Sequence, residues 1–228
     1  MASLSNVSKI AILGGAGALG SGLARRWAKA GRQVVIGSRD PERAQAAVAA
    51  INDACAAQRA SAATYRDAAA EADVIVVTVP FASQKDVLDQ IRDLVGDKVV
   101  VDCTVPLRPP RVGTVQLPPE GSAAQVARAI LDPGARLVSA FQNVGAALLA
   151  SDAAIDCDVL VCSDDNEARA VGVALAEAAG LRGLEAGPLA NAAAAEALTS
   201  LLIQINRRYK ADHAGIRVTG LPGDPRHG

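Results

Sequence analysis

The sequence predicts an α/β protein whose sheet is doubly wound, mostly parallel and covered by helices on both faces. Three observations lead to this prediction. Short apolar runs alternate with segments of helical periodicity along nearly all of the 228 residues, as in successive βαβ units. The centre of the run at 73–80 is apolar and β-branched, as expected of a strand buried on both faces. A glycine-rich loop, 14–20, follows the first apolar run and opens a helical segment.

The first part of the chain alternates strand and helix signals without a long interruption. Gly31 is expected to end the first helix, because glycine readily adopts the backbone conformation that follows a helix. Pro41 is expected to begin the second helix, where a missing N–H does no harm. The expected elements here are strands over 8–13, 33–37 and 73–80, helices over 18–30, 41–57 and 66–72, and a short edge strand over 61–65.

The second part continues the alternation around one irregular segment. Residues 107–120 are rich in proline and lack periodic apolar positions, so we expect a surface loop there. The expected elements are helices over 83–94, 122–131, 165–179 and 191–209, and strands over 98–101, 136–140, 158–162 and 183–186. Asp164 or Asp165 is expected to cap the helix over 165–179. Four aliphatic residues are expected to form the buried face of the last helix, namely Leu198, Leu201, Leu202 and Ile205.

Composition limits the classes of protein to which the chain can belong. Half of the residues are hydrophobic but only 2% are aromatic, so the core must consist of aliphatic side chains. The length suits one large domain, or one domain with a small appendage. A net charge of −1 without a basic stripe argues against a nucleic-acid partner. The sequence has neither an apolar run of membrane-spanning length nor an N-terminal leader, so we expect a cytoplasmic protein without a membrane partner.

The cysteines and histidines do not have the spacing of a metal site. None of Cys55, Cys103, Cys157 and Cys162 belongs to a C-x-x-C pair, and the chain has only two histidines. We therefore expect neither a structural metal nor a disulfide framework. Cys103 and Cys162 end apolar strand-like runs, where a free cysteine usually acts as a small hydrophobic residue.

The glycine loop has the spacing of a dinucleotide-binding motif. Gly15, Gly17 and Gly20 match Gly-x-Gly-x-x-Gly directly after a strand and at the start of a helix. The first glycine allows a tight turn, the second lets a pyrophosphate approach the backbone, and the third lets helix and strand pack closely. The pyrophosphate would lie on free N–H groups at the positive end of the helix dipole, so the residues between the glycines join the predicted contacts, namely Ala16, Ala18 and Leu19.

The residues after the second strand favour NADPH over NADH. An acid at this place would hold a ribose 2′-hydroxyl and repel a 2′-phosphate, but the chain has Ser38 and Arg39 there, with Arg43 one helical turn further on. A hydroxyl and two guanidinium groups suit a dianionic phosphate. Asp40 precedes a proline and is expected to cap the next helix instead.

Further ligand contacts are expected where other strands end, because ligands of an open α/β sheet bind beyond the carboxyl ends of its strands. Thr78, Val79 and Pro80 would flank the nicotinamide and its ribose. The segments 104–106 and 139–145 end two further strands. No serine, histidine and acid set or carboxylate pair occurs near these ends, and no catalytic residue is assigned. This composition fits hydride transfer, in which the cofactor carries the chemistry and the protein aligns the reactants.

With these motifs, the chain resembles the NADPH-dependent coenzyme F420 reductases, or F420H2:NADP oxidoreductases, over nearly its whole length. The more specific matches lie late in the sequence, in the segments 156–165, 185–189, 206–210 and 215–217. The resemblance implies a Rossmann-type domain over 1–188 and a C-terminal helical segment over 189–228 that completes the substrate pocket. It also implies a homo-oligomer, expected to be a homodimer, that passes a hydride between NADPH and C5 of the deazaflavin coenzyme F420.

The resemblance also implies positions for the ligands. The 2′-phosphate falls to Ser38, Arg39 and Arg43, and the nicotinamide end to Thr78, Val79 and Pro80. The implied contacts with the deazaflavin are Val105, Pro106, Phe141, Gln142, Asn143, Gly145 and Ile216.

The chain departs from the family pattern in the turn after the strand over 136–140. Gln142 and Asn143 stand where other members carry one or two histidines, and amides donate hydrogen bonds but carry no proton near neutral pH. We therefore expect the two amides to orient the second ring. The alternatives are an NADPH-dependent reductase of a flavin or of a small carbonyl or imine compound, and a non-catalytic NADPH-binding sensor.

Overall fold

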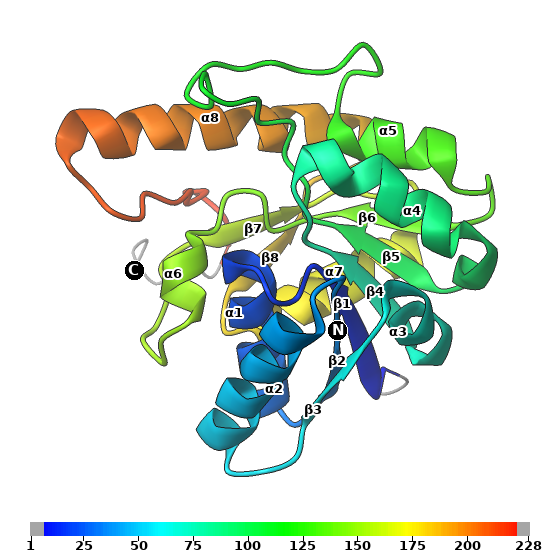
Figure 1. Ribbon diagram of the computed structural model, residues 1–228. Coiled ribbons are helices and arrows are strands. Elements are labelled where there is room, and N and C mark those ends of the chain that lie inside the picture. Colours follow the sequence, from blue (N-terminus) through cyan, green and yellow to red (C-terminus); the bar gives the residue numbers. More distant parts are fainter. Residues whose placement is uncertain (1–6, 223–228) are drawn as a thin grey trace.

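The computed structural model describes residues 7–222 and contains a six-stranded sheet in which every neighbouring pair of strands is parallel (Figure 1). The strand order is β3-β2-β1-β4-β5-β6, which reverses between β1 and β4 and is therefore doubly wound. The strands are β1 (Lys9–Leu13), β2 (Gln33–Gly37), β3 (Ala60–Ala63), β4 (Val74–Val77), β5 (Val99–Asp102) and β6 (Arg136–Ser139). The predicted fold class is confirmed, and β3 is the edge strand that the sequence predicted.

Helices cover both faces of this sheet, and successive residues of each strand enter two separate cores. On β1, Ile10 and Ile12 join the core beneath α1 and α7, whereas Ala11 and Leu13 join the core beneath α3 and α4. Trp27 is fully buried in the first core and donates from Nε1 to the carbonyl of Leu175 at 2.8 Å. The helices of the two layers are α1 (Ala18–Lys29), α2 (Pro41–Cys55) and α7 (Asn166–Ala178), and α3 (Tyr65–Glu71), α4 (Phe81–Val95) and α5 (Ala123–Ile130).

The predicted strands over 158–162 and 183–186 form a separate parallel pair, β7 (Asp158–Val161) and β8 (Arg182–Glu185). An antiparallel bridge between Ser139 and Cys162 connects this pair to the end of β6. The remaining elements are α6 (Ala146–Leu149), η2 (Leu189–Asn191) and α8 (Ala192–Tyr209), of which α6 and η2 are not among the predicted elements.

The predicted helix caps at Asp40 and Asp165 and the predicted packing roles of two cysteines are confirmed. The side chain of Asp40 accepts from the backbone N–H of Arg43 and caps α2, and that of Asp165 caps α7 in the same way. Cys103 and Cys162 are buried in the apolar cores as free thiols. Burial raises the pKa of the Cys103 thiol well above its ordinary value, so this group is an uncharged packing residue.

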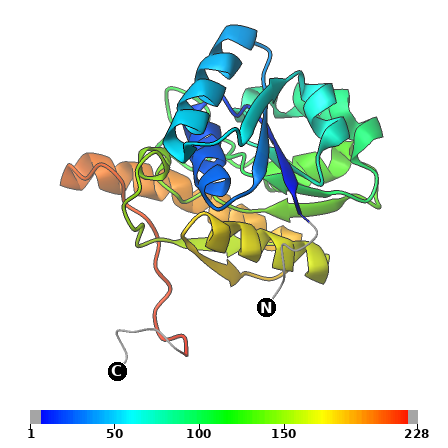
Figure 2. The same ribbon diagram turned by 90° about the horizontal axis from the view of Figure 1, so that it is seen from below.

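The prediction of a buried aliphatic face on α8 is wrong for the isolated chain. Leu201 is 48% exposed and Ile205 is 41% exposed, and both lie on the half of α8 that extends past the rest of the fold (Figures 1 and 2). Small and polar residues instead face the body of the molecule, namely Ala192, Ala195, Glu196 and Ser200. The reason is that Glu196 binds the start of α5, and this contact turns the aliphatic stripe of α8 outward.

A buried ion pair fixes the C-terminal segment to β7. Asp158 is fully buried and accepts from Arg182 Nε at 2.7 Å, from Arg182 Nη2 at 2.6 Å and from the backbone N–H of Val218 at 2.6 Å. Burial alone would raise the pKa of Asp158, but the hydrogen bonds from Arg182 and Val218 hold it below its ordinary value.

We expect Asp158→Asn to cost about 2 kcal/mol of folding free energy and to lower Tm by about 5 °C, because Arg182 loses its carboxylate partner. Since the pKa of Asp158 is lowered in the folded state, its contribution is present above about pH 4 and is lost as the pH falls further. Thermal melts between pH 7 and pH 3 should therefore show a smaller acid dependence in the variant. Asp152→Asn, at an exposed ion pair, is the control, and equal melting curves for the two variants would contradict the assignment.

Candidate functional site

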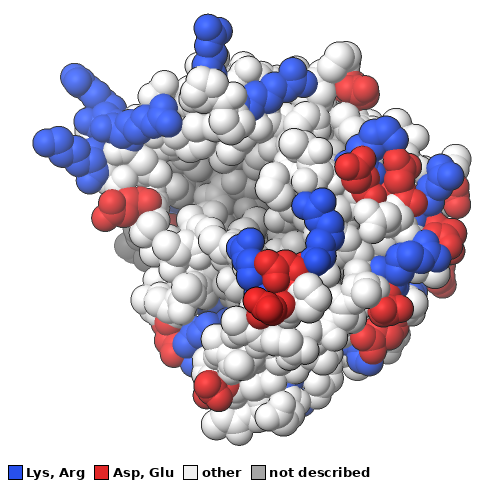
Figure 3. Space-filling model, viewed as in Figure 1, with Lys and Arg blue, Asp and Glu red and all other residues white. Residues whose placement is uncertain are grey.

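A cavity of about 880 Å³ opens at the carboxyl ends of the strands, beside the point where the strand order reverses. Figure 3 shows the hollow on this face of the molecule. All predicted cofactor contacts except Gly15 line it. The lining also includes residues that the sequence did not single out, among them Tyr65, Leu107, Pro109 and Val112. Three of these belong to the proline-rich loop, whose composition indicated only a surface segment.

The glycine loop packs too closely to accept side chains at several positions. Gly14, one residue before the predicted motif, has a φ of +86°, so the left-handed turn lies there. A Cβ at Gly20 would lie 2.6 Å from Thr78 Oγ1 and 2.7 Å from the Cα of Gly15. The third glycine of the motif therefore has the packing role that the sequence predicts. Gly17 has an ordinary φ of −82°, and a Cβ there would approach only the carbonyl of Gly14, at 3.2 Å.

The N-terminus of α1 has no side-chain cap. Its N-cap residue is Gly17, and the first turn contains no acidic residue, whereas side chains cap α2, α3, α5 and α7. The N–H groups of Ala18, Leu19 and Gly20 therefore lack partners within the helix. A ring of free N–H groups at the positive end of a helix dipole fits the pyrophosphate of a dinucleotide.

Two unpaired cations lie where the 2′-phosphate is expected. Within the described part of the chain, the side chains of Arg39 and Arg43 make no hydrogen bond or ion pair, and both line the cavity. Ser38 Oγ accepts from the backbone N–H of Asp40 at 3.1 Å, and the carboxylate of Asp40 is used as the α2 cap. Asp40 therefore has a structural role as a helix cap, and the guanidinium groups of Arg39 and Arg43 suit a phosphate.

The end of β4 forms the next part of the wall. Thr78 Oγ1 donates to the carbonyl of Leu13 at 3.0 Å, which holds the end of β4 against the glycine loop. Val79 and Pro80 follow, and Pro80 is the N-cap residue of α4. Cys103 and Thr104, after β5, lie across the same cavity, together with Val105. Pro106, predicted beside Val105, is buried and is not among the residues that line the cavity.

The turn after β6 is buried and densely hydrogen-bonded. Gln142 Nε2 donates to the carbonyl of Asp102 at 3.0 Å and to Ser139 Oγ at 2.9 Å, and Thr199 Oγ1 of α8 donates to the carbonyl of Gln142 at 2.9 Å. Gln142 Oε1 and Asn143 Oδ1 are buried and have no partner. An amide oxygen accepts hydrogen bonds, so these two atoms suit a ring N–H. The predicted acceptor contacts of this turn and of the C-terminal segment are not among the residues that line the cavity, namely Phe141, Gln142, Asn143, Gly145 and Ile216.

Phe141, a predicted contact with the second ring, has a place in the core. Its side chain is 1% exposed and meets Trp27 edge to face, with ring centroids 5.9 Å apart and planes at 78°. Its φ of +73° is unusual for a residue with a side chain and lets the backbone reverse after β6.

Sequence reasoning did not identify the buried acids that support this turn. Asp102 accepts from Gln84 Nε2 and, at 3.0 Å, from the backbone N–H of Thr104, and burial raises the pKa of its carboxyl. Glu196 accepts from the N–H groups of Ala123 and Ala124 at 2.6 and 3.0 Å, and burial raises its pKa to about 8. An acid within an apolar run is the signal that could have identified both residues.

The C-terminal segment returns to the same turn. A Cβ at Gly145 would lie 3.2 Å from the Cβ of His213, so this histidine packs directly on the turn. The carbonyl of Ile216 accepts from the backbone N–H of Asp158 at 2.7 Å, and a Cβ at Gly215 would lie 2.8 Å from Cys157 Sγ. The structure therefore brings the predicted residues Gly145 and Ile216 into one region, and it adds His213.

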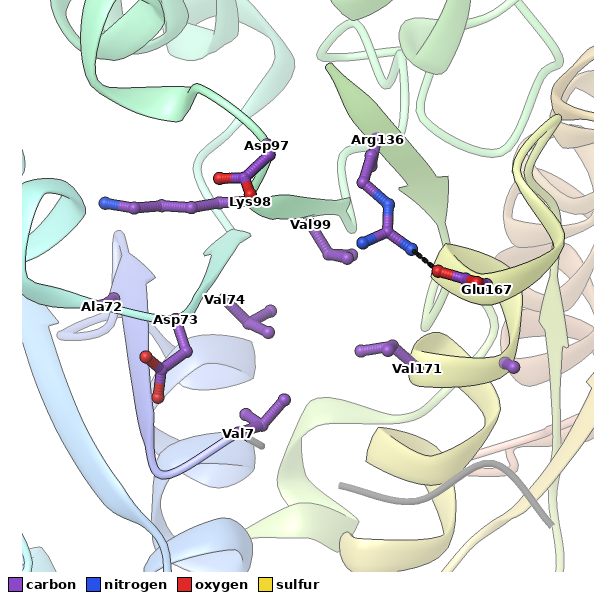
Figure 4. A pocket seen from close by; sticks show the side chains of 11 residues that line it. Val7, Ala72, Asp73, Val74, Asp97, Lys98, Val99, Arg136, Glu167 and Val171 are labelled. Atoms are coloured by element: carbon purple, nitrogen blue, oxygen red, sulfur yellow. Dashed lines mark hydrogen bonds and ion pairs between the residues drawn. The ribbon is translucent and has the colours of Figure 1, made fainter. Parts of the chain in front are cut away.

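A second cavity, of about 600 Å³, lies at the opposite edge of the sheet (Figure 4). Apart from Asp97, its charged side chains have partners within the described part of the protein. Arg136 contacts Glu167 at 3.1 Å, Lys98 Nζ donates to the carbonyls of Ala69 and Ala70, and Asp73 accepts from Ser8 and Lys9. This cavity therefore lacks the unpaired groups that distinguish the first one.

Within the described part of the chain, no group of three or more histidine, cysteine, aspartate or glutamate residues could hold a metal ion. No helix in residues 7–222 has both the length and the apolar character needed to cross a membrane.

Comparison with known proteins gives consistent matches. The family model described as "NADP oxidoreductase coenzyme F420-dependent" matches residues 9–106. An F420-dependent NADP reductase of Methanothermobacter thermautotrophicus is 45% identical, over 95% of this chain and 97% of the relative. One from Methanocaldococcus jannaschii is 38% identical, over 93% and 99%. The crystal structure of a putative F420-dependent NADP reductase from Arthrobacter sp. FB24 has the same fold, with a TM-score of 0.78 and 22% identity over 94% of this chain and all of that one.

We expect Gly17→Val to abolish measurable NADPH binding while the protein stays folded. The φ of Gly17 is accessible to any residue, so the backbone tolerates the substitution, but the new side chain occupies the space above the free N–H groups. Fluorescence titration with NADPH measures the loss of binding, and a thermal melt shows whether the variant is folded. Gly20→Ala is the comparison, because its Cβ would meet Thr78 and should lower Tm. A folded Gly17 variant with native affinity would show that the dinucleotide binds elsewhere.

Proposed function

The chain belongs to the family of F420-dependent NADP reductases, and from that premise we propose that it transfers a hydride between NADPH and the deazaflavin coenzyme F420. One observation supports this function above the others. A helix N-terminus with unpaired N–H groups, two unpaired arginines and a turn with unpartnered amide oxygens all occur at the carboxyl edge of one sheet. These groups suit a phosphorylated dinucleotide and a second polar ring.

The residues around the glycine loop would bind the donor. The N–H groups of Ala18 and Leu19 donate to the pyrophosphate, while Ser38, Arg39 and Arg43 hold the 2′-phosphate. Bound NADPH supplies the hydride. Thr78, Val79 and Pro80 fix the wall beside the nicotinamide, and the bond from Thr78 to Leu13 keeps that wall rigid.

The residues of the turn after β6 would orient the acceptor. Gln142 and Asn143 offer amide oxygens to a ring N–H, and the bonds of Gln142 to Asp102 and Ser139 fix its position. Neither amide carries a proton near neutral pH, so their role is alignment. Val105 lines the cavity, and Gly145 packs against His213.

We propose in addition that residues 189–228 complete the pocket of a Rossmann-type domain over 1–188. Three contacts support this division: Thr199 bonds Gln142, Glu196 bonds the start of α5, and His213 packs on Gly145. Residues 223–228 of the segment lie outside the described part of the chain. The cytoplasmic location expected from the sequence stays a prediction.

The decisive experiment mixes the protein and NADPH with F420, FMN, FAD and a small cyclic imine, and follows the loss of NADPH absorbance. Oxidation with F420 alone is the expected result. Oxidation with a flavin or the imine would favour the alternative reductases, and binding of NADPH without any oxidation would indicate a sensor.

We expect NADPH to be preferred to NADH by about 100-fold in kcat/KM, because two charge-assisted bonds to the 2′-phosphate are absent with NADH. The double variant Arg39→Ala/Arg43→Ala should raise KM for NADPH and leave that for NADH nearly unchanged. Steady-state kinetics with both cofactors measure this effect. Equal use of NADPH and NADH by the native protein would contradict the assigned phosphate site.

We propose that the protein is a homodimer that uses the exposed stripe of α8. Leu201, Ile205 and Tyr209 are 48%, 41% and 75% exposed and follow one another at four-residue intervals, so they lie on one helix face. A stripe of this kind on a helix that extends past its own fold suits contact with another protein surface. A second copy of the chain supplies that surface.

Leu201→Glu/Ile205→Glu should convert the dimer to a monomer, because each substitution places a charge in an apolar contact. Analytical ultracentrifugation of the variant and of the exposed-site control Arg59→Glu measures the change. A monomeric native protein, or a double variant with native mass, would exclude this face as the interface.

A further inference from the structure

The unpaired cations of the chain are concentrated around the candidate active site. Most described lysine and arginine side chains bond carboxylates or carbonyls, as Arg26 does with five carbonyl bonds and Arg66 with Asp93. Within residues 7–222, nine side chains of this kind have no hydrogen bond or ion pair. Seven fall into three groups, and two lie elsewhere: Arg39 and Arg43; Arg108 and Arg111; Arg207, Arg208 and Lys210; and, apart from these, Arg59 and Arg92.

Two of these groups belong to elements that touch one another. Arg108 and Arg111 alternate with Leu107, Pro109 and Val112, which line the active-site cavity. The same loop packs on α8, since a Cβ at Gly113 would lie 2.9 Å from the side chain of Gln204. Arg207 and Arg208 occupy the last turn of α8, directly after that contact, and Lys210 follows.

Figure 3 shows the resulting charge distribution. Lysine and arginine side chains gather over the free end of α8 at one edge of the hollow, and others lie over the loop above it. Asp212 is the acid in the same stretch as the α8 cluster and offsets one of its three positive charges. The edge therefore keeps a net positive charge, although the whole chain has a net charge of −1.

Interaction with the helix dipole accounts for only part of this cluster. Positive charges in the last turn of a helix interact favourably with the helix dipole, so Arg207 and Arg208 stabilise α8. The dipole does not explain Arg108 and Arg111, which lie in a loop. Nor is the group of Arg207, Arg208 and Lys210 needed for the dinucleotide. Arg39, in the loop after β2, and Arg43, on α2, line the cavity where the 2′-phosphate is expected.

We propose that Arg108, Arg111, Arg207, Arg208 and Lys210, termed here the acceptor rim, bind an anionic side chain of the hydride acceptor while its ring occupies the hollow. The proposal rests on the proposed function, since coenzyme F420 carries a phosphate and carboxylates on a flexible chain. Cations spaced along a rim suit such a chain, because each attracts a separate anionic group within a Debye length of about 10 Å. The rim would also draw the acceptor toward the hollow and so raise the association rate.

The test compares two acceptors that share the ring. One is complete F420, and the other is the same deazaflavin ending at its ribityl group, without phosphate or glutamate. The variants are Arg207→Gln/Arg208→Gln and Arg108→Gln/Arg111→Gln, and the matched control is Arg59→Gln/Arg92→Gln, which removes two unpaired arginines outside the rim. Thermal melts and NADPH titration establish that each variant is folded.

Each rim variant should raise KM for complete F420 by about 10-fold relative to KM for the truncated acceptor, since removing two exposed ion pairs weakens binding by about this factor. In the native protein, KM for F420 should rise with salt, and this dependence should be weaker in the rim variants. The control should keep the native ratio of the two KM values.

Three outcomes would overturn the proposal. Equal KM values for the two acceptors in the native protein would leave the reductase function in place but exclude the rim. Equal changes in KM for the two acceptors in the rim variants would mean that these arginines act on the fold or on the binding of the ring. A native protein that oxidises NADPH with neither acceptor would overturn the proposed function, and with it the rim.

Discussion

A chain of buried hydrogen bonds centred on Asp102 holds the acceptor half of the site together. The carbonyl of Asp102 accepts from Gln142, and its carboxylate accepts from Gln84 and from the backbone of Thr104. Gln84 continues the chain to the carbonyl of Ala123, whose N–H is bound by Glu196 of α8. Five segments that are distant in sequence are thus joined through polar groups in a dry interior, where an unmade bond is costly. These bonds hold the segments together although Gln84 Oε1 and Gln142 Oε1 have no partner.

The dinucleotide half of the site could be predicted from the sequence because its signals are local. A strand, a glycine loop and a helix follow one another within 9–29, and the residues proposed to bind the 2′-phosphate begin directly after the second strand. Each signal has a physical origin within a few residues, such as the close contact of Gly20 with Thr78 or the cap that Asp40 places on α2. The positions of the strands were predictable for the same reason, since strands covered on both faces are short, apolar and β-branched. The strand predicted over 73–80 is shorter, Val74–Val77, because Thr78–Pro80 leave the sheet to form the cavity wall.

The acceptor half could not be predicted in the same detail because it depends on contacts between distant residues. Nothing near Glu196 in the sequence indicates that it binds the first N–H groups of α5, 72 and 73 positions earlier. The periodicity of α8 identifies its aliphatic face but not the surface that covers it, and this is why Leu201 and Ile205 are exposed in the single chain. The position of His213 on Gly145 likewise follows from the return of the C-terminal segment, which composition does not specify.

The edge-to-face contact between Trp27 and Phe141 has an optical consequence. Trp27 is the single tryptophan of the chain, it is fully buried, and its ring touches the residue that begins the acceptor turn. Its emission is therefore that of an indole shielded from water, and no second indole contributes to the signal. Tryptophan emission overlaps the absorption band of the reduced nicotinamide, so bound NADPH quenches it by energy transfer. The protein thus contains an intrinsic fluorophore that responds both to occupancy of one half of the site and to rearrangement of the other.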